Sequence, residues 1–115
     1  MRIVVALGLA VLLAACASVP AGNYEGVQAD ASGGGQQYVR VTLKPDGFAA
    51  VSSAFTGRPS RFLAEGTWVE EGRRVRLELE KQSLVFERRG DQLVAREWDR
   101  SVWGEAGPGV LQRVF

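Results

Sequence analysis

The chain has 115 residues with 14 basic and 13 acidic side chains, and it contains no histidine, one cysteine and one methionine. This balanced charge argues against a nucleic-acid partner, which requires a basic face. Without imidazole, and with a single thiol, the chain lacks the ligands of copper and zinc sites and the His-activated nucleophiles of hydrolases. We therefore expect no metal, no cofactor and no enzymatic activity.

The first 16 residues have the pattern of a bacterial lipoprotein signal. Arg2 gives a positive start, residues 3–11 are apolar, and Leu13-Ala14-Ala15-Cys16 matches a lipobox. The apolar run is shorter than the ~20 residues of a spanning helix. We predict that residues 1–15 are a signal peptide and that Cys16 is the lipid anchor; the alternatives are an uncleaved membrane anchor and an ordinary secretory signal. Ala17, in place of aspartate, favours the periplasmic side of the outer membrane.

Residues 16–23 are predicted to form a lipidated tether, and residues 24–115 a single β domain. Alternating apolar and polar residues separated by glycine and proline turns indicate an all-β protein. Strands are expected at residues 24–28, 38–44, 48–55, 62–68, 74–80, around 84–86, at 93–98 and at 110–115. Loops and turns are expected at residues 30–35, 45–47, 56–59, 70–73, 88–91 and 104–109. Residues 95–100 could instead form a short helical turn. Turns about every ten residues favour a small antiparallel meander barrel of about seven or eight strands.

The inward positions of these strands predict a mostly filled barrel. The expected core consists of Val39, Val41, Leu43, Val51, Phe55, Phe62, Trp68, Val75, Leu77, Leu79, Leu84, Phe86 and Leu93. Gly66 falls inside a strand, which is typical of a crowded, curved sheet or of a bulge.

The spacing of several motifs resembles the N-terminal domain of the NlpE family of copper-resistance lipoproteins. The motifs are Tyr24-x-Gly26, Leu43-x-x-Asp46-Gly47, Phe55-x-Gly57 and Phe62-x-x-x-Gly66-x-Trp68-x-x-x-Gly72-x-x-Val75-x-Leu77, within residues 24–93. This resemblance implies a lipocalin-like barrel on an outer-membrane tether, with roles in copper tolerance, surface sensing and envelope stress. The Cys-x-x-Cys pair of the family would fall near Asp30 and Gly33, so its metal or redox chemistry is not expected here.

Two groups of residues are candidate partner or ligand contacts. Arg58 and Arg61 flank Pro59 and could form an anion-binding rim at one end of the barrel, or simply a solvated turn. Trp98 and Trp103 lie in the least regular segment, where they could anchor a partner or plug the barrel. The alternating Arg and Glu residues of 70–89 are expected to form exposed salt bridges, with a peptidoglycan-binding or protein-docking face as the alternative.

The sequence thus predicts a non-enzymatic outer-membrane lipoprotein of NlpE-like type, acting as an envelope sensor or protein-interaction module. A lipocalin-like barrel that binds a small molecule or lipid is the first alternative, and a lysozyme-inhibitor-like lipoprotein is the second. A large apolar cavity would favour ligand binding, whereas a filled barrel with exposed aromatic residues would favour interaction with a protein.

Overall fold

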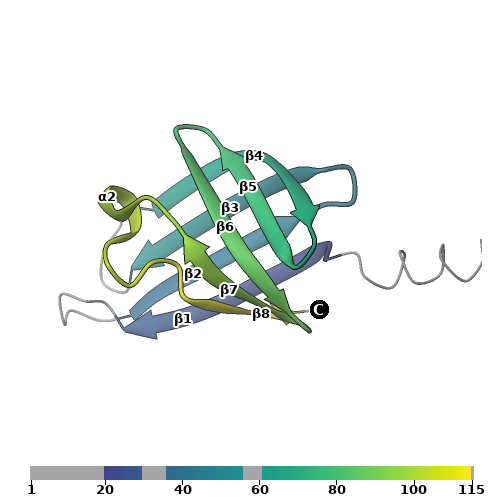
Figure 1. Cartoon of the computed structure of the whole chain (residues 1–115). Coiled ribbons are helices and arrows are strands. Elements are labelled where there is room, and N and C mark those ends of the chain that lie inside the picture. Colours follow the sequence, from purple (N-terminus) through teal and green to yellow (C-terminus); the bar gives the residue numbers. More distant parts are fainter. Residues whose placement is uncertain (1–19, 30–35, 56–60, 115) are drawn as a thin grey trace, which may run out of the picture.

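The computed structural model describes residues 20–29, 36–55 and 61–114, with the backbone alone described at residues 28–29, 55 and 61–62. Eight strands form a closed antiparallel barrel in chain order (Figure 1). They are β1 Gly22–Ala29, β2 Gln36–Leu43, β3 Phe48–Phe55, β4 Arg61–Glu71, β5 Arg74–Leu79, β6 Gln82–Arg89, β7 Gln92–Glu97 and β8 Val110–Val114, with the helical turn α2, Arg100–Trp103, between β7 and β8. The predicted all-β meander barrel is confirmed. Among the described residues, no helix has the length and apolar character needed to span a membrane.

The strands form because apolar residues alternate with polar ones along them. In β5, Val75, Leu77 and Leu79 are buried while the three residues between and before them are exposed. In β2 the buried positions are Gln37, Val39, Val41 and Leu43. A period of two places successive side chains on opposite faces of a strand, so one face of each strand lines the barrel interior and the other meets solvent.

Glycine shapes the barrel at two kinds of position. Gly47 ends the predicted 45–47 turn with φ 95°, and its amide donates to the Lys44 carbonyl at 3.0 Å. Gly66 lies within β4, where a Cβ atom would come within 1.9 Å of the backbone oxygen of Glu78 on β5. The sequence-based expectation of crowding at Gly66 is therefore confirmed.

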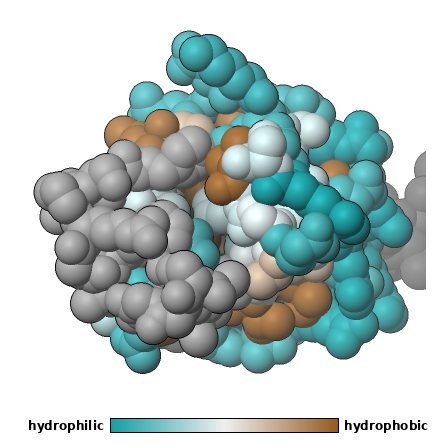
Figure 2. Space-filling model, turned by 90° about the vertical axis from the view of Figure 1, so that its left-hand side faces the viewer, coloured by the Kyte–Doolittle hydropathy of each residue, from teal (hydrophilic) through white to brown (hydrophobic). Residues whose placement is uncertain are grey.

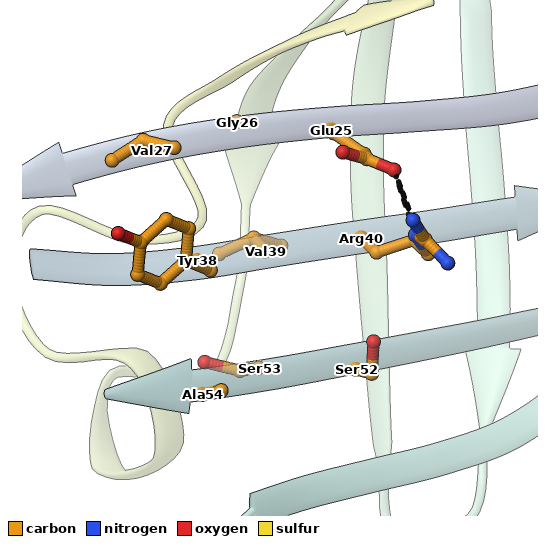
Figure 3. A pocket seen from close by; sticks show the side chains of 9 residues that line it. All are labelled: Glu25, Gly26, Val27, Tyr38, Val39, Arg40, Ser52, Ser53 and Ala54. Carbon is orange, nitrogen blue, oxygen red and sulfur yellow. Dashed lines mark hydrogen bonds and ion pairs between the residues drawn. The ribbon is translucent and has the colours of Figure 1, made fainter. Parts of the chain in front are cut away.

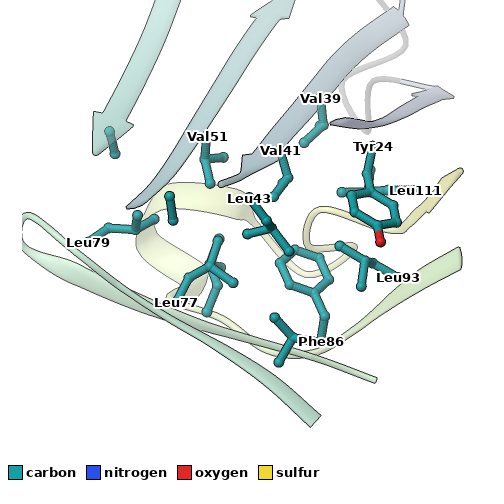
Figure 4. Packing of buried hydrophobic residues seen from close by; sticks show 14 of the residues in the cluster. Tyr24, Val39, Val41, Leu43, Val51, Leu77, Leu79, Phe86, Leu93 and Leu111 are labelled. Atoms are coloured by element: carbon teal, nitrogen blue, oxygen red, sulfur yellow. The ribbon is translucent and has the colours of Figure 1, made fainter. Parts of the chain in front are cut away.

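The interior holds a cluster of side chains contributed by every strand (Figure 4). Ten of the predicted core residues are buried there, namely Val39, Val41, Leu43, Val51, Val75, Leu77, Leu79, Leu84, Phe86 and Leu93. The side chains of Phe55 and Phe62 lie outside the described part. Prediction of Trp68 as a fully buried core residue is wrong: it is partly buried and packs at the edge of the cluster. The cluster also contains residues absent from the prediction, namely Tyr24, Ala49, Ala64, Trp103 and Leu111.

Several predicted boundaries change. β1 begins at Gly22, inside the predicted 16–23 tether, because its residues pair with β2 from Gly22↔Leu43 onwards. β4 extends to Glu71, so the predicted turn at 70–73 is a tight turn of Gly72 and Arg73. The alternative of a helical turn at 95–100 is wrong, since β7 runs to Glu97 and the helix occupies Arg100–Trp103.

Candidate functional site

The up-and-down order of the strands gives the barrel two distinct ends (Figure 1). One end, here called the α2 end, carries α2, the Glu80–Lys81 turn and the ends of β1 to β4 that flank residues 30–35 and 56–60. The other, here called the Pro20 end, carries Pro20, the tight turns at 44–47, 72–73 and 90–91, and the end of β8. The chain from Cys16 therefore enters the barrel at the end opposite α2.

The helical turn α2 is built from a local capping arrangement. Asp99 is its N-cap, and Asp99 Oδ1 accepts hydrogen bonds from the Ser101 amide at 2.9 Å and from Ser101 Oγ at 2.6 Å. Such a side chain satisfies a backbone donor that the first helical turn leaves without a partner. The hydroxyl and amide of Ser101 stabilise the ionised carboxylate, so they lower the pKa of Asp99 from its usual value.

The two tryptophans of this segment face inward, as in the predicted plug. Trp103 is buried in the core cluster, and its Nε1 donates to Gln82 Oε1 on β6 at 2.9 Å. Trp98 packs against the same cluster and donates from Nε1 to the Gly104 carbonyl at 2.9 Å. Gly107, with φ 66°, leaves room for the Trp98 ring, which a Cβ atom would approach within 2.5 Å. The tryptophans thus close the α2 end; contact with a partner or ligand stays a prediction.

Polar groups also lie inside this end of the barrel. Gln37 Nε2 donates to Ser53 Oγ at 2.9 Å, and both residues are buried. Because a buried polar group without a partner destabilises the fold, this pair satisfies part of its own hydrogen-bonding needs. Neither residue was identified from the sequence as a site candidate, since glutamine and serine at alternate strand positions give no distinct signal.

The structure describes only one of the two residues of the predicted arginine rim. Arg61 opens β4, where its backbone pairs with Ala54 of β3 at the α2 end. Arg58 lies outside the described residues, as do Cys16 and the region of Asp30 and Gly33. The anion-binding role of Arg58 and Arg61 stays a prediction.

Exposed apolar side chains gather around the α2 end. Five of the six exposed large hydrophobic residues in the described part lie within three residues of this end of a strand or within α2. We call them the collar: Val27, Tyr38, Leu63, Val102 and Val110. Hydrophobic atoms appear at several places around this end, with hydrophilic ones between them (Figure 2). This surface could not be predicted from the sequence because its members come from five different elements.

Two hollows lie beside the collar. Val27 and Tyr38 are register partners on β1 and β2, next to a groove of about 340 Å³ (Figure 3). Arg40 Nε donates to Glu25 Oε2 at 2.8 Å across this groove. A second hollow of about 300 Å³ lies between Leu63 and Val102. The collar therefore combines exposed apolar side chains with a recessed surface, which is the usual composition of an interface core.

The described architecture has a counterpart among solved structures. The barrel resembles that of NlpE. The crystal structure of the Cpx pathway activator NlpE from Escherichia coli superposes with a TM-score of 0.57 and 22% sequence identity, over 67% of this chain and 41% of the NlpE chain. No protein-family model and no curated protein sequence matches this chain. The likeness to NlpE is one of fold, and this chain spans less than half of the NlpE chain.

The Pro20 end differs in chemistry from the collar. Tyr24 is buried at the base of the barrel and donates its hydroxyl to the Pro20 carbonyl at 2.6 Å; this burial raises the pKa of Tyr24. Arg113 Nη2 donates to the Ala21 carbonyl at 2.8 Å, and Arg88 Nε lies 3.4 Å from Glu70 Oε2. Pro20 and Ala21, at the C-terminal end of the predicted 16–23 tether, are thus hydrogen-bonded to the barrel, while residues 16–19 lie outside the described part.

The predicted salt-bridged faces are present on the strands. Exposed pairs join Arg74 with Glu97 at 3.1 Å and Arg76 with Glu71 at 3.5 Å. The Glu87 carboxylate forms ion pairs with Arg89 at 2.6 Å and with Arg96 at 3.3 Å. The hydrogen bond from Arg89 is the main cause of the lowered pKa of Glu87. Exposed pairs of this kind contribute ~0–1 kcal/mol each, so they describe a solvated surface and do not define a site.

Proposed function

We propose that this protein is a non-enzymatic outer-membrane lipoprotein of NlpE-like type that faces the periplasm and docks an envelope protein through the collar. The observation that carries the proposal is the separation of the two ends. Apolar side chains of the collar are exposed at the α2 end, and the chain that leads to Cys16 enters at the opposite end. A lipid anchor at Cys16 would leave the collar free to meet a partner.

The composition of the collar supports a protein partner. Leu63 and Val27 are 67% and 57% exposed, and the ring of Tyr38 is 48% exposed. Tyrosine is enriched at interface cores, where clustered apolar anchors carry most of the binding energy. A closed barrel has no free strand edge for a partner to extend. Recognition would therefore depend on these side chains and the hollows between them.

The lipid anchor is tested by replacement of Cys16. We expect Cys16→Ala to accumulate with an uncleaved leader, and the lipid-dependent enrichment in outer-membrane fractions to disappear. Normal cleavage with unchanged membrane association of Cys16→Ala would contradict the lipoprotein assignment.

The collar is tested by site-specific photo-crosslinking of the lipidated protein in intact cells. A photoreactive phenylalanine analogue replaces Tyr38, and the same analogue at Phe48, an aromatic position at the Pro20 end of β3, is the matched control. We expect a discrete protein adduct at position 38 that Leu63→Glu removes, and none at position 48. Equal adducts at both positions, or no adduct at 38, would refute docking through the collar.

A small-molecule or lipid-binding barrel is the second candidate, supported by the buried Gln37–Ser53 pair. A ligand that entered the α2 end would meet these two polar side chains in the interior. Titration of lipids into the purified protein would then change the tryptophan fluorescence, with Trp103→Phe as the variant that loses the change. A constant spectrum would exclude this function.

A further inference from the structure

The Pro20 end carries an apolar surface of its own. A shallow groove of about 470 Å³ is lined by Pro20, Pro45, Trp68, Val69 and Glu70, among others. Val69 is 52% exposed, and the Trp68 ring is fixed by a hydrogen bond from its Nε1 to the Lys44 carbonyl at 2.8 Å. The groove therefore presents a partly exposed indole and an isopropyl group on a rigid rim.

One wall of this groove lies close in sequence to the predicted lipid anchor, and this proximity indicates what covers the groove. Pro20 forms one of its walls and is held by the Tyr24 hydroxyl, so it cannot move away from the barrel without breaking that bond. Only four residue steps separate Pro20 from Cys16, which limits the distance between their Cα atoms to about 14 Å. A lipid attached at Cys16 would bring its bilayer within reach of the groove.

The charges around the groove suit lipid headgroups. Lys44 and Arg73 are exposed at neighbouring turns, and neither forms an ion pair with another described residue. Two of the three acids nearby are ion-paired, Glu70 with Arg88 and Glu71 with Arg76. The third, Asp46, also lines the groove and accepts a hydrogen bond from the Phe48 amide at 3.0 Å. Lys44 Nζ lies over the Phe48 ring, 5.3 Å from its centroid, and no carboxylate of the described residues pairs with it, so its charge is available to phosphate. An indole prefers the water–hydrocarbon boundary.

We propose that the Pro20 end is a bilayer-facing surface on which the barrel stands. Trp68 and Val69 enter the headgroup region, Lys44 and Arg73 contact lipid phosphates, and the α2 end points away from the membrane. An eight-residue strand at the usual barrel tilt spans roughly 20 Å, which lifts the collar clear of the headgroups. This inference rests on the proposed lipidation of Cys16.

Two valines of similar exposure provide a matched test. Lipidation consumes the only native thiol, so Val69→Cys and Val102→Cys each offer one site for an environment-sensitive fluorophore. The two native side chains are 52% and 42% exposed and lie at opposite ends of the barrel. The lipidated variants are reconstituted into phosphatidylethanolamine–phosphatidylglycerol vesicles with or without a lipid that carries a nitroxide near its headgroup. Circular dichroism verifies the fold of each variant.

We expect the emission of the label at position 69 to shift to shorter wavelength and to be quenched by the nitroxide. The label at position 102 should keep its emission intensity. Lys44→Glu combined with Arg73→Glu should weaken the quenching at 69. The inference is wrong, and the proposed anchoring still stands, if quenching is equal at both positions. The same holds if the protein floats with the vesicles but the label at 69 is not quenched. A blue shift at 69 without quenching shows that residues 17–19 fill the groove, and also overturns the inference. If the lipid-processed protein does not float with the vesicles, both the proposed lipid anchoring and the inference are wrong.

Discussion

At the scale of single residues, Trp103 is more deeply buried than Trp68. Trp103 is 6% exposed within the core cluster, whereas Trp68 is only partly buried at its edge. We expect Trp103→Ala to lower the free energy of unfolding by ~3–5 kcal/mol, the range for truncation of a large aromatic residue in a core. Trp68→Ala should have a smaller effect. Denaturant midpoints of both variants measure this, and Val102→Ala serves as the exposed control. A larger loss for Trp68 than for Trp103 would contradict the packing of α2 onto the barrel.

Gly66 is the second residue on which the barrel depends. A Cβ atom at this position would lie 1.9 Å from the Glu78 carbonyl oxygen, so β4 and β5 would have to separate. We expect Gly66→Ala to destabilise the protein by at least the ~1–3 kcal/mol typical of overpacking.

Thermal or denaturant unfolding of the purified protein provides the measurement for Gly66→Ala. Gly72→Asn is the matched control, because Gly72 has φ 66° with open space around it and asparagine tolerates this conformation. If Gly66→Ala were as stable as Gly72→Asn, the close approach of β4 and β5 would be wrong.

At the scale of elements, α2 depends on the charge of Asp99. Because the folded-state pKa of Asp99 lies below its usual 3.8, the cap stabilises the folded state above that value. The contribution is lost as the pH falls from about 4 through the lower folded-state pKa. We therefore expect α2 to loosen at acidic pH before the barrel unfolds.

Near-ultraviolet circular dichroism of the tryptophans, followed from neutral to acidic pH, checks this expectation. Asp99→Asn keeps the hydrogen-bond acceptor and removes the titrating group, so its spectrum should lose the acid-dependent step attributed to the cap. Asp99→Ala should show the loosened signal at all pH values. An unchanged acid transition in Asp99→Asn would assign the step to other carboxylates.

At the scale of the whole molecule, β8, which closes the barrel against β1 at a seam, forms the fewest residue pairs with its neighbours of the described strands. β8 pairs with β1 at three positions and with β7 at three, whereas β1 and β2 pair at eight. Regions held by few hydrogen bonds open at lower free energy than the rest of a domain. Arg113 Nη2 adds a bond across the seam to the Ala21 carbonyl.

Hydrogen exchange should therefore find the amides of β8 less protected than those of β3 and β4, and Arg113→Ala should increase this difference. Glu105→Ala, on the exposed segment before β8, is the control and should leave the β8 protection unchanged. Equal protection of β8 and β3 would show that closure is as stable as the central ladders.

Local sequence pattern is enough to predict the strands, most turns and most of the core, because a period of two fixes which side chains share a face. Val75, Leu77 and Leu79 alternate so cleanly that local pattern alone predicts their burial. The conformational properties of proline and glycine likewise predict the Pro45-Asp46-Gly47 turn and the crowding at Gly66. The sequence also predicts a lipobox that ends at Cys16, which lies outside the described residues.

Which distant residues meet depends instead on the folded barrel. Trp103 reaches Gln82 across 21 positions, and the collar joins residues 27, 38, 63, 102 and 110. Strand alternation says that Tyr38 faces outward, but not that Val27 is its neighbour or that both lie opposite the entry of the chain. That information resides in the register and closure of the barrel, which depend on how all eight strands pack together.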